Sequence, residues 1–95
     1  MPIAHIAALG STRKMLGFSR STVDLEGGTI ADLLRQLRTQ DGSRLYDSLV
    51  YNGKLRPDFA IVVDGLSLKA DQLDKLLQGG EHVVTMAIIR HLAGG

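Results

Sequence analysis

The chain begins and ends with strongly apolar, β-prone segments, and this pairing constrains the fold more than any other feature of the sequence. Residues 3–9 are apolar except for His5, and residues 83–89 read Val-Val-Thr-Met-Ala-Ile-Ile. Strands that are this strongly apolar belong in the middle of a sheet. We therefore expect a first strand over residues 3–9 and a last strand over residues 82–89, both in the middle of one sheet.

Thr29 begins the clearest helix of the sequence. Its hydroxyl can accept a hydrogen bond from the backbone N–H of Asp32, whose carboxylate would lie near the positive end of the helix dipole. Four apolar residues lie at the i, i+3, i+4, i+7 spacing of one helical face: Ile30, Leu33, Leu34 and Leu37. The pattern predicts a helix from Thr29 to about residue 40, ending near Asp41-Gly42.

Shorter segments complete the expected order of elements. They are residues 11–17 (a turn or one helical loop), 22–25 (a strand), 43–49 (a short helix), 52–53 (a turn), 59–63 (a buried strand), 64–65 (a hairpin turn), 66–68 (a short strand) and 73–77 (a helical turn). Together they predict an α+β fold, with a mixed four- to five-stranded sheet and one main helix across one face.

A single helix covers only one face of a sheet. In the last strand, Val84, Met86 and Ile88 would lie on one face, and Val83, Ala87 and Ile89 on the other. If the first set packs under the helix, the second set remains uncovered, and an uncovered apolar face usually marks a protein interface. We expect this interface to include Leu9, Ala87 and Ile89.

Composition excludes several classes of function. The chain of 95 residues suits a single domain, and its net charge of +1 gives no field for holding a nucleic-acid backbone. It has no cysteine, and His5, His82 and His91 lack metal-ligand spacing, so we expect no metal site and no catalytic constellation. No apolar run approaches the roughly 20 residues of a membrane span, and no signal peptide is apparent, so a cytoplasmic protein is expected.

The sequence ends at Gly94-Gly95. Glycine has no Cβ, so two glycines can pass through a narrow channel and present a carboxylate to another protein. A frayed terminus is the alternative for these two residues, because small residues are common at chain ends.

In its ordered set of segments, the chain resembles the ubiquitin-like sulfur carriers of the β-grasp fold. Among these carriers, it most resembles the small subunit of molybdopterin synthase and the thiamine-pathway sulfur carrier. The resemblance covers nearly the whole chain and implies one β-grasp domain over residues 1–95, with a flexible tail from about residue 90. The matching segments are residues 13–17 (RKMLG), 26–34 (EGGTIADLL), 61–65 (IVVDG), 77–81 (LQGGE) and 87–95 (AIIRHLAGG).

The resemblance implies a carrier rather than an enzyme. An activating enzyme related to those that activate ubiquitin would use ATP to adenylate Gly95, and a sulfur donor would convert the adenylate to a thiocarboxylate. Gly94 and Ala93 would give access, and Arg90 and Leu92 would extend the partner interface. The acceptor of the sulfur would be bound by a second partner, the large subunit of molybdopterin synthase or an equivalent enzyme. The carrier would hold no cofactor stably, and would bind neither nucleic acid nor membrane.

Three alternatives remain open from the sequence. The carrier could serve thiamine synthesis, tRNA thiolation or cysteine synthesis instead of molybdopterin synthesis. It could be a protein modifier, in which a lysine amine of a target attacks the activated Gly95. It could also be an interaction or regulatory domain with an inert tail.

Overall fold

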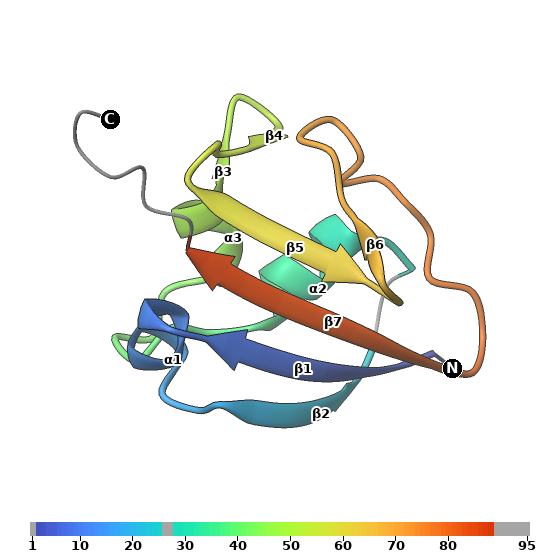
Figure 1. Ribbon diagram of the computed structural model, residues 1–95, viewed down its shortest axis with the longest axis horizontal. Helices are drawn as coiled ribbons and strands as arrows, with labels where there is room; N and C mark the ends of the chain where they lie inside the picture. The colour runs from blue at the N-terminus through green and yellow to red at the C-terminus, as the bar shows by residue number, and fades with distance from the viewer. Residues whose placement is uncertain (1, 26–27, 89–95) are drawn as a thin grey trace.

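Figure 1 shows the computed structural model of the protein, which describes residues 2–25 and 28–88. Its main sheet has five strands in the order β2-β1-β7-β5-β6. The first and last of the main strands, β1 and β7, are parallel neighbours in the middle, and the remaining pairs are antiparallel. The central position predicted for both apolar strands is therefore confirmed. The strands are β1 (Ile3–Leu9), β2 (Arg20–Asp24), β5 (Phe59–Val63), β6 (Leu66–Ser67) and β7 (Glu81–Ile88).

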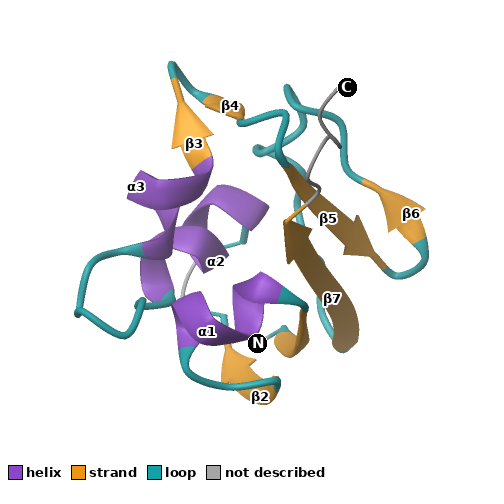
Figure 2. Ribbon diagram, turned by 60° about the vertical axis from the view of Figure 1, so that its left-hand side comes forward, coloured by secondary structure: helices purple, strands orange, loops and turns teal. Residues whose placement is uncertain are grey.

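Helices cover one face of this sheet, as Figure 2 shows. The main helix α2 (Ile30–Gln36) and the short α3 (Leu45–Leu49) lie behind the strands in Figure 1, while α1 (Ser11–Leu16) follows β1 at the end of the sheet. The fold is α+β, as predicted. The core between the layers contains Ile6, Ile61, Val84 and Met86 from the sheet, and from the helices it contains Ile30, Leu33, Leu34, Leu45 and Leu49.

The start of α2 has the cap that the sequence predicts. Thr29 Oγ1 accepts a hydrogen bond from the Asp32 backbone N–H at 3.0 Å, and Asp32 Oδ2 accepts one from the Thr29 backbone N–H at 3.2 Å. Asp32 Oδ2 also accepts from the Gly28 N–H at 3.1 Å. Hydrogen bonding of the Asp32 carboxylate to the Thr29 side chain, and then to the backbone N–H groups of Thr29 and Gly28, lowers the pKa of Asp32 below its ordinary value.

The end of α2 differs from the prediction. The helix ends at Gln36, earlier than the expected residue 40, and Leu37 takes an extended conformation while staying buried. Contacts distant in sequence stop it, because the Gln40 N–H donates to the Met15 carbonyl and the Leu45 N–H donates to the Leu37 carbonyl. Each of these bonds needs a chain direction that a continued helix would not give.

The predicted helical turn at residues 73–77 is wrong. Instead of a helix, this segment forms an isolated bridge in which Leu76 pairs with Thr29, and the Leu77 N–H donates to the Gly28 carbonyl at 2.7 Å. The apolar spacing there arises because Leu73 and Leu77 both point into the core. Their burial does not require a helix.

A second, two-stranded sheet was not predicted. Its strands β3 (Val50–Tyr51) and β4 (Lys54–Leu55) flank Asn52-Gly53, the turn that the sequence did predict. Asn52 has φ 53° and Gly53 has φ 76°, the positive values required by a two-residue hairpin turn of type I′. The Asp64-Gly65 turn between β5 and β6 has the same form and confirms the predicted hairpin.

Candidate partner-binding face

The face of the sheet opposite α2 and α3 is the candidate functional site, and we call it the outer face. Along each central strand, buried residues alternate with outward-facing ones. The outward positions are Ile3, His5, Ala7 and Leu9 on β1, Glu81, Val83, Thr85 and Ala87 on β7, and Ala60 and Val62 on β5. This division confirms that Val84 and Met86 pack under the helix and that Val83 and Ala87 do not.

Two residues of the predicted interface lie together on the outer face. Ala87 of β7 is the register partner of Leu9 on β1 and of Ala60 on β5, so it lies between them. Leu9 has 52% of its surface exposed, and Ala87 is partly buried. The small side chains at Ala60 and Ala87 would let the surface of a partner approach the sheet closely, and Leu9 supplies apolar area at the edge of this contact.

The remaining predicted site residues follow β7. Ile89, Arg90, Leu92, Ala93, Gly94 and Gly95 lie outside the described residues. The last described residue pair of the sheet is Ile88 with Phe59 of β5. Since β1 and β7 are parallel, the carboxyl end of β7 lies at the same end of the sheet as Leu9, Gly10 and α1.

A polar cluster lies at the other end of the outer face. The His5 Nε2 atom is 2.7 Å from Glu81 Oε1, and the His5 Nδ1 atom is 3.1 Å from Thr22 Oγ1. These contacts connect β1 to both of its neighbours, β7 and β2. His5 and Glu81 are exposed by 42% and 68%, so the pair is solvated and adds little to stability. The cluster makes the apolar part of the face asymmetric, with charge at one end and Leu9 at the other.

Sequence reasoning missed the contributions of β5 to this face. Ala60 and Val62 lie in a run, residues 59–63, that is apolar throughout, so its composition alone does not show which residues point outward. Their place follows only from the register of β5 with β7, in which Ala60 pairs with Ala87 and Val62 with Thr85.

In the part of the chain that the structure describes, no cluster of three or more His, Asp or Glu side chains could hold a metal ion. None of the described helices has the length and apolar character needed to cross a membrane. The outer face, with its small and apolar side chains, is chemically suited to binding another protein surface.

The architecture is that of the ubiquitin-like β-grasp fold, as expected from the sequence. Its structural neighbours include a protein assigned as molybdopterin converting factor subunit 1 from Pyrococcus furiosus, with a TM-score of 0.67 and 17% identity over 95% of this chain and 100% of that one. The small archaeal modifier protein 1 of Methanosarcina acetivorans has a TM-score of 0.66 and 19% identity over 100% and 98%. The HVO 2177 protein of Haloferax volcanii has a TM-score of 0.69 and 18% identity over 95% and 85%.

No family model matches the sequence, and no curated protein matches it. At these identities, the likeness to the solved structures shows the fold.

Proposed function

We propose that this protein is a sulfur carrier in which the carboxylate of Gly95 is adenylated and then converted to a thiocarboxylate. The pathway that we propose for this sulfur is molybdopterin synthesis. The observation that carries the proposal is the position of Gly94-Gly95 shortly after β7, a central strand of a ubiquitin-like fold. The likeness to a molybdopterin converting factor subunit over 95% of the chain supports the choice of pathway.

The chemistry needs an activated carboxylate. In the first step of the proposed reaction, the Gly95 carboxylate attacks the α-phosphate of ATP, pyrophosphate leaves, and an acyl adenylate forms. A sulfide nucleophile then attacks the acyl carbon, the acyl–phosphate bond breaks, and AMP leaves with the electron pair. The product is a thiocarboxylate that can donate its sulfur. The activating enzyme supplies the ATP site, so the carrier requires no cofactor of its own.

The outer face gives the two partners a surface to bind. Leu9, Val83 and Ala87 lie on strands β1 and β7, and Gly94-Gly95 follow β7 in the sequence. Both the activating enzyme and the sulfur-acceptor enzyme must hold the residues that follow β7. We propose that both use this face, one after the other.

The second candidate is a protein modifier. The likeness to the small archaeal modifier protein 1 covers all of this chain and is as close as the likeness to the converting factor subunit. In this alternative, a lysine amine of a target attacks the same adenylate and an amide bond forms. The first step is identical, so the two candidates differ only in the nucleophile that follows.

Intact-mass measurement tests the proposal. The purified chain is incubated with the activating enzyme of its host, ATP and a sulfur source, and a carrier gains the mass difference between one sulfur and one oxygen atom. A modifier instead appears joined to lysines of other proteins. If neither product forms and a chain lacking the last two residues still functions in the host, the interaction domain with an inert tail is the correct alternative.

The pathway needs a separate test in the host. Deletion of the gene should abolish the activity of molybdenum- or tungsten-dependent enzymes. A requirement for added thiamine or cysteine, or loss of thiolated tRNA, would assign the carrier to one of the other pathways.

A further inference from the structure

Tyr51 is exposed in a way that its role in the fold does not explain. The chain has two tyrosines and two phenylalanines, and the other three aromatic residues, Phe18, Tyr46 and Phe59, pack against the core. Tyr51 has 71% of its surface exposed at the end of β3. Exposed aromatic rings are enriched where proteins bind one another, because they offer a large rigid contact area.

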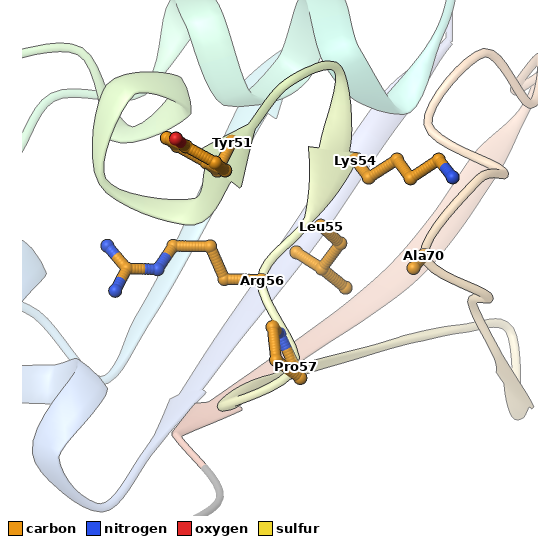
Figure 3. Close-up of a pocket in the computed structure, with 6 residues that line it drawn as sticks. All are labelled: Tyr51, Lys54, Leu55, Arg56, Pro57 and Ala70. Carbon is orange, nitrogen blue, oxygen red and sulfur yellow. The ribbon is translucent and has the colours of Figure 1, made fainter.

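Tyr51 is part of the wall of an apolar groove. The groove has a volume of about 540 Å³ and lies between the β3–β4 hairpin and the loop that contains Ala70. Leu55 is buried beneath it, and Pro57 lies beside Leu55 in Figure 3. The residues that line the groove are Tyr51, Lys54, Leu55, Arg56, Pro57 and Ala70.

Backbone hydrogen bonds fix the two sides of the groove. The Leu55 N–H donates to the Ala70 carbonyl at 3.0 Å, which ties the hairpin to the opposite loop. The Arg56 N–H donates to the Leu49 carbonyl at 2.8 Å, which ties the hairpin to the end of α3. A groove held in this way exists before any ligand arrives, so less ordering cost opposes binding.

Both ends of the groove carry positive charge. In Figure 3 the side chains of Lys54 and Arg56 extend in opposite directions from the apolar middle. Arg56 lies 3.7 Å from Asp58 in an exposed, weak ion pair, and Lys54 has no ion-pair partner among the described residues. The chain as a whole carries a net charge of only +1, so this charge is a local feature.

We propose that the groove binds an acidic–apolar segment of a partner protein. An apolar side chain of the segment packs between the Tyr51 ring and the Leu55–Pro57 floor, and carboxylates before and after it meet Arg56 and Lys54. The groove shares no residue with the outer face. It is therefore a second docking surface, and its use does not depend on the chemistry of Gly95.

The test uses the full chain labelled with ¹⁵N and the end-blocked peptide DDLFDD. Titration should give saturable chemical-shift changes confined to the amides of residues 51–56 and 69–72. The peptides KKLFKK and DDSSDD should give no saturable change, since one reverses the charge and the other removes the apolar side chains. Added salt should weaken the binding of DDLFDD because exposed charges contribute to it.

Charge reversal provides the matched comparison. The double variant Lys54→Glu with Arg56→Glu should bind DDLFDD at least about tenfold more weakly, through repulsion of the peptide carboxylates. The variant Arg13→Glu with Lys14→Glu makes the same change of net charge on α1, away from the groove, and should bind like the wild type. If the first double variant fails to fold, Lys54→Gln and Tyr51→Ala separately provide the same comparison.

Four results would overturn the proposal. They are the absence of saturable shifts with DDLFDD, an equal response to KKLFKK, equal loss of binding in both double variants, and a stronger response to a short single-stranded oligonucleotide than to the peptide. A fifth result would also overturn it: amide shifts of residues 51–56 that depend on protein concentration alone would assign the groove to a second copy of this chain.

Discussion

The Nδ1 atom of His82 lies 2.8 Å from Oδ2 of Asp64, and this contact joins the start of β7 to the turn between β5 and β6. The other ring nitrogen of His82, Nε2, lies 2.7 Å from the carbonyl oxygen of Gln78. Both neighbours are hydrogen-bond acceptors, and only the protonated imidazolium donates from both nitrogens at once. The hydrogen bond to Asp64, followed by that to Gln78, raises the pKa of His82 above its usual 6.5.

The first prediction is a stability that depends on pH through this pair. A raised folded-state pKa means that the contribution of His82 is fully present below pH 6.5 and is lost as pH rises through the folded value. The hydrogen bond from His82 lowers the pKa of Asp64, and the bond from the Val83 N–H lowers it to a smaller extent. The contribution of Asp64 to stability is therefore lost as pH falls below 3.8. In urea unfolding, the His82–Asp64 pair should therefore add most to the free energy of unfolding between pH 3.8 and pH 6.5.

Two variants isolate this contribution. His82→Gln should lower the free energy of unfolding by about 0.5–1.5 kcal/mol between pH 3.8 and 6.5, and by less outside this range. Asp64→Asn keeps a residue that tolerates the positive φ of this turn but removes the carboxylate, so the pKa of His82 measured by NMR should fall toward 6.5. A wild-type His82 pKa at or below 6.5 would contradict the geometry.

The second prediction concerns the cap of α2. Thr29→Ala removes the acceptor of the Asp32 N–H and should cost about 1 kcal/mol in the free energy of unfolding. Thr29→Ser retains a hydroxyl at the same position and should restore most of that loss. Equal destabilisation by both substitutions would show that the Thr29 methyl group, rather than the hydrogen bond, stabilises this end of the helix.

Features that depend on local chemistry were predictable from the sequence. The capping box needs only Thr29 and Asp32, three residues apart, and the two hairpin turns need only Asn52-Gly53 and Asp64-Gly65. The central place of β1 and β7 follows from their composition, because strongly apolar strands favour the middle of a sheet over its edges.

Features set by contacts distant in sequence were not predictable in the same way. The end of α2 depends on the bond from Gln40 to Met15, and the path of residues 73–77 depends on the pairing of Leu76 with Thr29. The groove at Tyr51 was missed for the same reason. Ala70 forms one side of it, and nothing in the sequence near Tyr51 indicates that Ala70 lies opposite.

The third prediction tests the core under α2. Leu34 is fully buried, so Leu34→Ala should lower the free energy of unfolding by about 2–5 kcal/mol through lost burial and a cavity. Leu66→Ala removes the same atoms from a side chain with 66% of its surface exposed, and should change stability by less than about 0.5 kcal/mol. Urea unfolding of both variants makes the comparison. Similar losses would place Leu34 outside the core.

The fourth prediction tests the outer face. Leu9→Asp should leave the fold intact, because the side chain is 52% exposed, but should weaken binding of the activating enzyme by about tenfold or more through an unpaired charge in the contact. Leu66→Asp is the matched control. Leu66 is similarly exposed, but its register partner Val63 faces the core, so Leu66 is not on the outer face. Equal affinity of the Leu9→Asp and wild-type chains would exclude this face. Ile89→Asp extends the same test to the residue after Ile88.

The fifth prediction places the chemistry at Gly95. Deleting Gly95 removes the correctly placed carboxylate, and Gly94→Val adds a branched Cβ where the chain must be narrow to enter an adenylation site. Both changes should abolish ATP-dependent activation, measured as pyrophosphate release with the activating enzyme. Both should leave the melting temperature nearly unchanged, because the core of the described residues runs from Ala4 to Met86.

The contrast with Leu9→Asp is diagnostic. Loss of binding should raise the KM for the carrier, and activation should recover at high carrier concentration, whereas a chain without Gly95 should stay inactive at every concentration. If the chain lacking Gly95 is activated like the wild type, the reacting carboxylate is not at this residue and the proposed function fails.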